Sequence, residues 1–132
     1  MVIAFAGWPD ATESATGAIR YLADQLGGTK IAEIDPEEFY VFTESRPQIR
    51  KNQMGDRDLV WPVNEFYQID SDDGHGLLLF VGTEPNLRWR TFSNILLHVA
   101  RKSQVETIVS LGALLDEVPH TRATRVTGKA TT

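Results

Sequence analysis

Three stretches of this chain share one layout, in which a short apolar run ends at a glycine and a polar loop follows. They are residues 2–7, residues 77–82 and residues 107–112. Buried parallel strands read as continuous apolar runs, and the ligands of open α/β sheets bind beside the loops that leave the carboxyl ends of such strands. The repeated layout therefore predicts an α/β sheet and also the edge of that sheet where a functional site would lie.

The size and charge of the chain exclude several classes of protein. A length of 132 residues suits one domain, large enough for a sheet with a helix layer on each side. The net charge of -5 argues against general binding to nucleic acid phosphates. The chain has no cysteine, which excludes disulfides, thiolate metal sites and cysteine nucleophiles. The apolar runs are too short for a secretory signal or a membrane span, so we expect a cytoplasmic protein with no membrane partner.

The spacing of apolar residues predicts the main elements. A helix is expected over residues 12–26, capped by Thr12 or Asp10, because apolar residues recur there at helical spacing. A second strand is expected over residues 29–34. Residues 37–68 read as short β-like pieces separated by turn residues, which predicts a β-hairpin insertion.

The second half of the chain repeats the alternation of strand and helix. A helix is expected over residues 87–102 and a further strand over residues 105–111. Residues 116–132 then mix a proline, a glycine and several threonines, with no helix to follow. The expected fold class is a three-layer α/β/α domain with a mostly parallel sheet, and this ending predicts either a fragment or a chain whose final elements are absent.

The densest polar cluster follows the second glycine, Gly82. This glycine lets the backbone approach a ligand, and a helix N-terminus just beyond it would offer unpaired N–H groups to an anion. Glu84, Asn86 and Arg88 could orient a polar substrate there. The alternative is a capped helix with Glu84 near the positive end of its dipole and with solvated arginines. We favour a binding loop because of its position at a strand end.

A second candidate site follows the third glycine, Gly112. His120 could act as a general base near neutral pH, and Arg122 could bind a carboxylate or a phosphate. No serine or cysteine stands beside His120, so it is a candidate only, and a structural histidine is the alternative. The full predicted ligand-binding set is Asp10, Gly82, Glu84, Asn86, Arg88, Gly112, His120, Thr121 and Arg122.

An acidic loop around residues 70–75 suggests a metal site at first sight. Asp70, Asp72, Asp73 and His75 lack the ligand spacing of an EF-hand, and a solvated turn explains them better. The chain also lacks the glycine patterns of phosphate-binding and dinucleotide-binding loops. We therefore expect no metal and no cofactor.

Three segments are distinctive enough to compare with known families. They are Gly-Trp-Pro-Asp at residues 7–10, Gly-Thr-Glu-Pro-Asn-Leu-Arg-Trp at residues 82–89, and the run over residues 111–122. In this order they resemble the actinobacterial branch of the proteasome assembly chaperone two family. The pieces at residues 43–47 and 60–62 are similar as well, and the chain resembles only the N-terminal half of that family's members.

The resemblance implies a core similar to that of nucleoside phosphorylases, a cleft at the carboxyl ends of the strands, and a homo-oligomer. A trimer is one option, with the hairpin as a contact. No reaction is implied, because eukaryotic relatives act as chaperones in proteasome assembly and some bacterial relatives carry a predicted ligase label. Three functions stay open: binding of a small anionic or nucleoside-like ligand, which we favour, a protein–protein assembly chaperone, and a hydrolase or ATP-dependent ligase.

Overall fold

A five-stranded sheet forms the centre of the protein, which we describe from a computed structural model covering residues 1–72 and 74–131. Its strand order is β2-β5-β6-β1-β7. Strands β1 (Val2–Ala6), β6 (Leu77–Thr83) and β7 (Val109–Leu111) run parallel to one another. Strand β5 (Glu65–Ile69) runs antiparallel to both of its neighbours, β6 and β2 (Thr29–Glu33). The expected α/β class is confirmed, but the sheet is mixed, and only β6, β1 and β7 pair in parallel.

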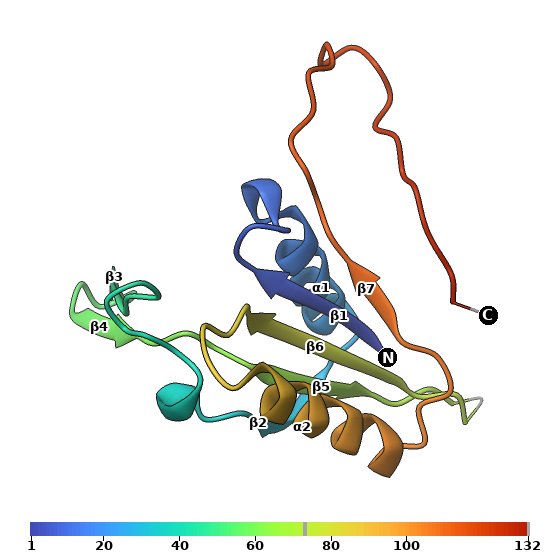
Figure 1. The fold of residues 1–132 in the computed structure, drawn as a ribbon, viewed down its shortest axis with the longest axis horizontal. Helices are drawn as coiled ribbons and strands as arrows, with labels where there is room; N and C mark the ends of the chain where they lie inside the picture. Colours follow the sequence, from blue (N-terminus) through green and yellow to red (C-terminus); the bar gives the residue numbers. More distant parts are fainter. Residues whose placement is uncertain (73, 132) are drawn as a thin grey trace.

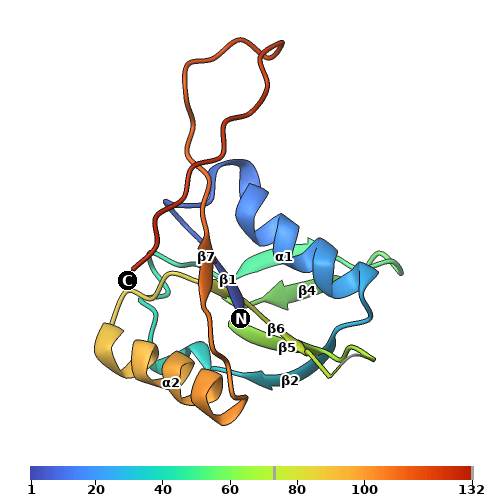
Figure 2. The same cartoon turned by 90° about the vertical axis from the view of Figure 1, so that its right-hand side faces the viewer.

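One helix packs on each face of this sheet (Figures 1 and 2). Helix α1 (Ser14–Gln25) buries Ile19 against Ala4 and Leu79. Helix α2 (Trp89–Lys102) buries Phe92 and Leu96 against Phe66 and Phe80, in a cluster that also includes the half-buried Phe5. Neighbouring strand residues therefore serve opposite faces, as the period of two in a strand requires. Among the described residues, neither helix combines the length and the apolar content needed to cross a bilayer.

Strand β5 was not predicted as part of the main sheet. Its sequence alternates and carries Glu65, unlike the apolar runs of β1 and β6, yet it lies between β2 and β6. The charge is tolerated because Lys30 Nζ lies 2.9 Å from Glu65 Oε1, across the β2–β5 pair. Burial by itself would raise the pKa of Glu65, but hydrogen bonds from Lys30 and Tyr67 outweigh it and lower that pKa.

A β-hairpin stands apart from the main sheet (Figure 1, left). Its strands β3 (Gln48–Lys51) and β4 (Arg57–Val60) form a separate antiparallel pair. The hairpin therefore covers residues 48–60, a shorter segment than the predicted residues 37–68. The turn is organised by Asn52, whose Oδ1 accepts hydrogen bonds from the N–H groups of Met54 and Asp56. Residues 40–42 form no strand and instead follow the short 3₁₀ helix η2 (Pro36–Glu38).

Residues 114–131 form an extended arm that rises beyond the end of β7 (Figure 1). The arm is anchored at its base, where Ala113 N–H donates to Pro9 O at 2.7 Å and Ala11 N–H donates to Ala113 O at 3.0 Å. Apart from this anchor its side chains are exposed. Asp73, a member of the acidic loop discussed above, and Thr132 lie outside the described residues.

Candidate functional site

The carboxyl ends of β1, β6 and β7 meet at one edge of the sheet because these strands are parallel. At this edge Glu84 N–H donates to Ala6 O at 3.0 Å. The Glu84 side chain lies over Gly7, where an added Cβ would come within 2.9 Å of Glu84 Oε2. Gly7 has a φ of +136°, a backbone conformation that favours glycine, whereas the Glu84 carboxylate could move aside to admit a Cβ. The half-buried Glu84 carboxylate makes no hydrogen bond or ion pair within the described part of the chain.

Asp10 has a structural role at the start of α1. It is 7% exposed, and Asp10 Oδ1 accepts hydrogen bonds from the N–H groups of Ala15 and Thr16 at 2.8 and 3.1 Å. Asp10 Oδ2 accepts a hydrogen bond from the Thr16 hydroxyl. Both oxygens therefore accept hydrogen bonds within the chain, and this carboxylate caps the first turn of α1.

Asn86 and Arg88 also have partners in the chain. Asn86 Oδ1 accepts hydrogen bonds from Val41 N–H and Ser45 Oγ, each at 2.9 Å, and so fixes the segment that leads to the hairpin. Arg88 pairs with the exposed Glu38. Helix α2 begins only at Trp89, after Arg88, which has a φ of +53°. The sequence predicted that this helix begins at residue 87. Its free N–H groups therefore begin two residues later than expected, beyond the polar loop that follows Gly82.

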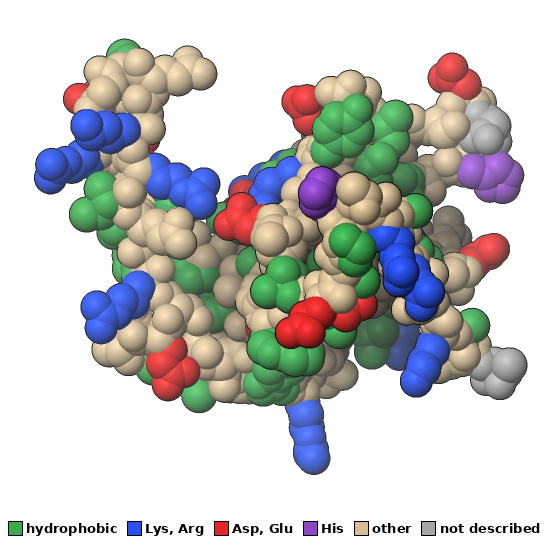
Figure 3. All heavy atoms as spheres, turned by 90° about the horizontal axis from the view of Figure 1, so that it is seen from above, with side chains coloured by type: hydrophobic (Ala, Val, Ile, Leu, Met, Phe, Trp, Pro, Cys, Tyr) green, Lys and Arg blue, Asp and Glu red, His purple; other side chains and the backbone are tan. Residues whose placement is uncertain are grey.

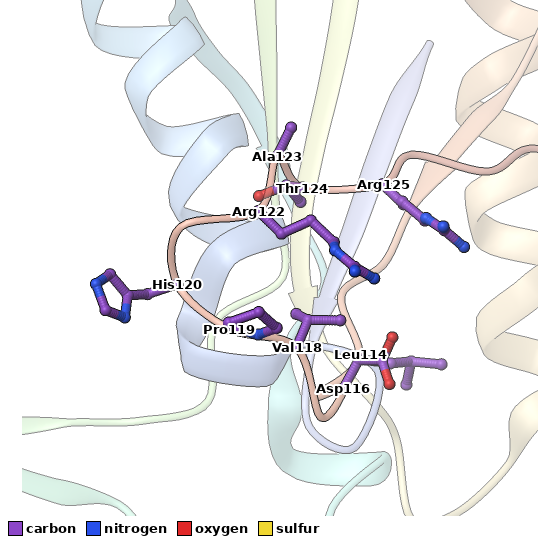
Figure 4. A pocket seen from close by; sticks show the side chains of 9 residues that line it. All are labelled: Leu114, Asp116, Val118, Pro119, His120, Arg122, Ala123, Thr124 and Arg125. Carbon is purple, nitrogen blue, oxygen red and sulfur yellow. The ribbon is translucent and has the colours of Figure 1, made fainter.

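His120, Thr121 and Arg122 lie on the exposed arm. They belong to a turn in which Arg122 N–H donates to Pro119 O at 2.9 Å. Figure 4 shows His120 and Arg122 pointing to opposite sides of this turn. A hollow of about 250 Å³ lies here, and all of its lining residues belong to the arm itself, between Leu114 and Arg125. His120 and Arg122 both line this hollow. Glu84 is not one of its lining residues.

A buried hydrogen-bond network beneath the Gly82 loop was missed in the sequence. The Tyr40 hydroxyl lies 2.8 Å from Asn64 Oδ1 and 2.6 Å from Thr83 O, and Thr83 N–H donates to Asn64 Oδ1 at 3.1 Å. Burial raises the pKa of Tyr40 to about 12. A Cβ on Gly82 would come within 2.9 Å of Asn64 Oδ1 and 2.6 Å of the Phe80 ring, so Gly82 is required by packing.

One signal for this network was present in the sequence. Asn64 stands two positions before Phe66, so the two side chains point to the same face of the strand. That face is buried, and Asn64 is only 1% exposed. An amide at a core-facing position predicts a buried hydrogen-bond partner. Asn64 Nδ2 has no partner in the described structure.

A groove of about 390 Å³ lies between the base of the hairpin and the end of β2. Its walls include Leu59 and Trp61 on one side and Ile34 and Pro36 on the other. Trp61 packs edge-on against Phe42, with ring centroids 4.9 Å apart. No group of three or more residues of the metal-ligating types comes together in the described residues.

The whole chain matches one protein family. The model of the PAC2 family matches residues 4–132. The chain belongs to the PAC2 family. A solved structure of a proteasome-assembly chaperone homologue from Mycobacterium tuberculosis is 42% identical and superposes with a TM-score of 0.81. A PAC2 family protein from Streptomyces avermitilis is 38% identical, with a TM-score of 0.78. The resemblance to the actinobacterial branch of this family is thereby confirmed.

The relatives are longer than this chain. Each of these two alignments covers 92% of this chain and 52% of the relative. A protein of unknown function from Corynebacterium glutamicum, 27% identical with a TM-score of 0.78, is covered over 45% of its length. The chain thus spans about half the length of these solved structures. A search of the curated proteins finds no match.

Proposed function

We propose that this PAC2 protein works by protein–protein contact in the assembly of a larger complex, with the hairpin β3–β4 as its contact element. The carrying observation is a hairpin that exposes apolar side chains while its base is held firmly. Ile49 and Leu59 are cross-strand partners, and they are 68% and 54% exposed. An isolated two-stranded hairpin is only marginally stable, and exposed apolar pairs on it favour contact with another surface.

The base of the hairpin is rigid enough to present this pair. Asn86 holds Val41 and Ser45, and Phe42 packs against Trp61, so both ends of the hairpin segment are tied to the domain. The name of the M. tuberculosis relative, a proteasome-assembly chaperone homologue, supports an assembly role. The predicted homo-oligomer, with a trimer as one option, is one form that such contact would take.

A double substitution on the hairpin tests this function. The 132-residue chain, tagged and immobilised, is used to capture proteins from an actinobacterial lysate, and the captured proteins are identified by mass spectrometry. We expect Ile49→Ser with Leu59→Ser to lose the captured partner. Tyr21→Ser is the matched control, because Tyr21 is 65% exposed on α1, away from the hairpin. Equal capture by the hairpin variant and the unaltered chain would contradict the proposal.

Glu84 favours a second candidate function, the binding of a small ligand at the sheet edge. A half-buried carboxylate without a partner is suited to accept hydrogen bonds from the hydroxyl groups of a nucleoside-like molecule. It is unsuited to an anion, which it would repel. We expect adenosine to raise the melting temperature of the chain and inorganic phosphate to leave it unchanged. An equal adenosine shift in Glu84→Ala would show that this carboxylate is not the ligand's partner.

A further inference from the structure

The register of the hairpin places two cations side by side. Lys51 and Arg57 are direct cross-strand partners. Each lies two residues from a member of the apolar pair Ile49 and Leu59, so all four side chains share one face of the hairpin. Both cations are exposed, and within residues 1–72 and 74–131 neither takes part in an ion pair. Like charges placed directly opposite each other destabilise a β-hairpin.

The opposite face of the hairpin is arranged differently. There Arg50 stands across from Asp58, so the charges of that cross-strand pair are opposite. The four residues Ile49, Lys51, Arg57 and Leu59, which we call the cationic face, therefore differ from the other face in two respects. They combine an exposed apolar pair with an uncompensated pair of positive charges. Figure 3 shows Lys and Arg side chains gathered at the hairpin end of the molecule, on the left.

The cationic face adjoins the groove at the hairpin base, whose lining is mostly apolar and also includes Glu33 and Glu65, both paired with Lys30. Leu59 belongs to both, and Trp61 and Pro36 continue the apolar surface away from the two cations. A segment that places an apolar side chain in the groove would therefore carry its next side chains toward Lys51 and Arg57. Carboxylates at those positions would neutralise both cations and remove the repulsion between them.

We propose that the cationic face and the adjoining groove bind an acidic protein segment, in which an apolar side chain and a carboxylate stand two residues apart. This inference rests on the proposed assembly function and names the chemistry of the partner. Charge complementarity carries it: residues 46–60 contain four Lys or Arg and two Asp, although the whole chain has a net charge of -5. A spacing of two residues is required because the apolar pair and the cation pair lie on the same face of the hairpin, and an extended segment presents every second residue to that face.

The test uses a synthetic peptide with the repeat Leu-Ser-Glu-Ser, called the Leu-Glu peptide, labelled for fluorescence anisotropy, with the 132-residue chain. We expect binding that weakens as salt rises, because the partner charges are exposed. The double variant Lys51→Glu with Arg57→Glu should lose about tenfold or more in affinity. The same variant should instead bind a peptide in which Lys replaces each Glu. Arg125→Glu with Lys129→Glu, on the exposed arm, makes the same change of charge away from the hairpin and should bind the Leu-Glu peptide within about twofold of the unaltered chain.

A single substitution separates binding from folding. Lys51→Glu places a carboxylate opposite Arg57, so it should slow amide hydrogen exchange in the hairpin by roughly threefold while it weakens peptide binding. If Lys51 had a purely structural role, a variant that slows hydrogen exchange in the hairpin would not also weaken peptide binding. Loss of hairpin structure in the double variant would appear as faster exchange, and the single variant keeps the test decisive in that case.

Three results would overturn the inference. One is failure of the Leu-Glu peptide to bind at low salt, and another is equal affinity of the peptide for the charge-reversed variant. The third is binding of single-stranded RNA through Lys51 and Arg57 with no binding of the peptide. The double variant Lys51→Glu with Arg57→Glu keeps Ile49 and Leu59. If this variant still captures the partner from the lysate, the assembly function stands and only the acidic chemistry of the partner is wrong.

Discussion

Tyr40, which precedes the hairpin, and Asn64, which follows it, are joined to the end of β6 by buried hydrogen bonds. Tyr40 is 4% exposed, and its hydroxyl contacts Asn64 Oδ1 and Thr83 O. We expect Tyr40→Phe to lower the free energy of unfolding by about 1–3 kcal/mol, because Thr83 O loses a buried donor. Urea unfolding followed by circular dichroism measures this change. Tyr21→Phe, on the exposed surface of α1, should change the unfolding free energy by less than about 0.5 kcal/mol.

The same hydroxyl predicts how stability changes in alkali. The pKa of Tyr40 rises from 10.0 to about 12 in the folded chain. The folded state therefore holds this proton where the unfolded state has lost it, so the contribution to stability is complete below pH 10 and is lost as the pH rises through about 12. Urea midpoints measured across this range should fall more steeply for the unaltered chain than for Tyr40→Phe. Parallel curves for the two proteins would show that Tyr40 is not the group responsible.

Asp10 was predicted to bind a ligand, and in the structure its carboxylate accepts hydrogen bonds from the first turn of α1. Asp10→Ala removes the acceptor for Ala15 N–H, Thr16 N–H and the buried Thr16 hydroxyl. We expect a loss of about 1–3 kcal/mol in the free energy of unfolding, and a smaller loss for Asp10→Asn, which keeps one acceptor oxygen. Thermal unfolding compares the two variants with Glu13→Ala, an exposed carboxylate of the same turn. Equal stability of Asp10→Ala and Glu13→Ala would contradict the capping role.

At the scale of the elements, strands and helices were predictable where the pattern was local. The apolar runs of β1 and β6 and the helical spacing of α1 and α2 are visible in the sequence, and the structure confirms them. Strand β5 was missed because its charge is compensated by Lys30, which is 35 positions away in the chain. Asp10 and Asn86 accept hydrogen bonds from N–H groups at other positions, and such partners cannot be seen in a sequence.

The proposed assembly function depends on the hairpin. Its cross-strand register, which no periodicity reveals, sets Ile49 beside Leu59 and Lys51 beside Arg57. The register depends on the tight turn around Asn52, with Gly55 at a φ of +88°. We expect Gly55→Val to disrupt this turn and to abolish partner capture, because a β-branched residue is strained at positive φ. Capture equal to that of the unaltered chain would show that hairpin geometry is not required.

At the scale of the whole molecule, this PAC2 chain pairs a well-packed core with two projecting segments. The core lies between α1 and α2, whereas the hairpin and the arm extend from it in different directions (Figure 1). His120 and Arg122 lie on this exposed arm and line a hollow formed by arm residues alone, and Glu84 is not among its lining residues. The hairpin, in contrast, joins exposed apolar side chains, cations and a groove in one place.

Amide hydrogen exchange of the chain, alone and in the complex captured from the lysate, tests the hairpin contact most directly. In the dilute chain the amides of β3 and β4 should exchange fast, since an isolated hairpin is marginally stable, while those of β1 and β6 exchange slowly. In the complex we expect strong protection over β3, β4 and the groove at the hairpin base. Protection confined to the sheet edge around Gly7 and Glu84, with the hairpin still exchanging fast, would contradict the account.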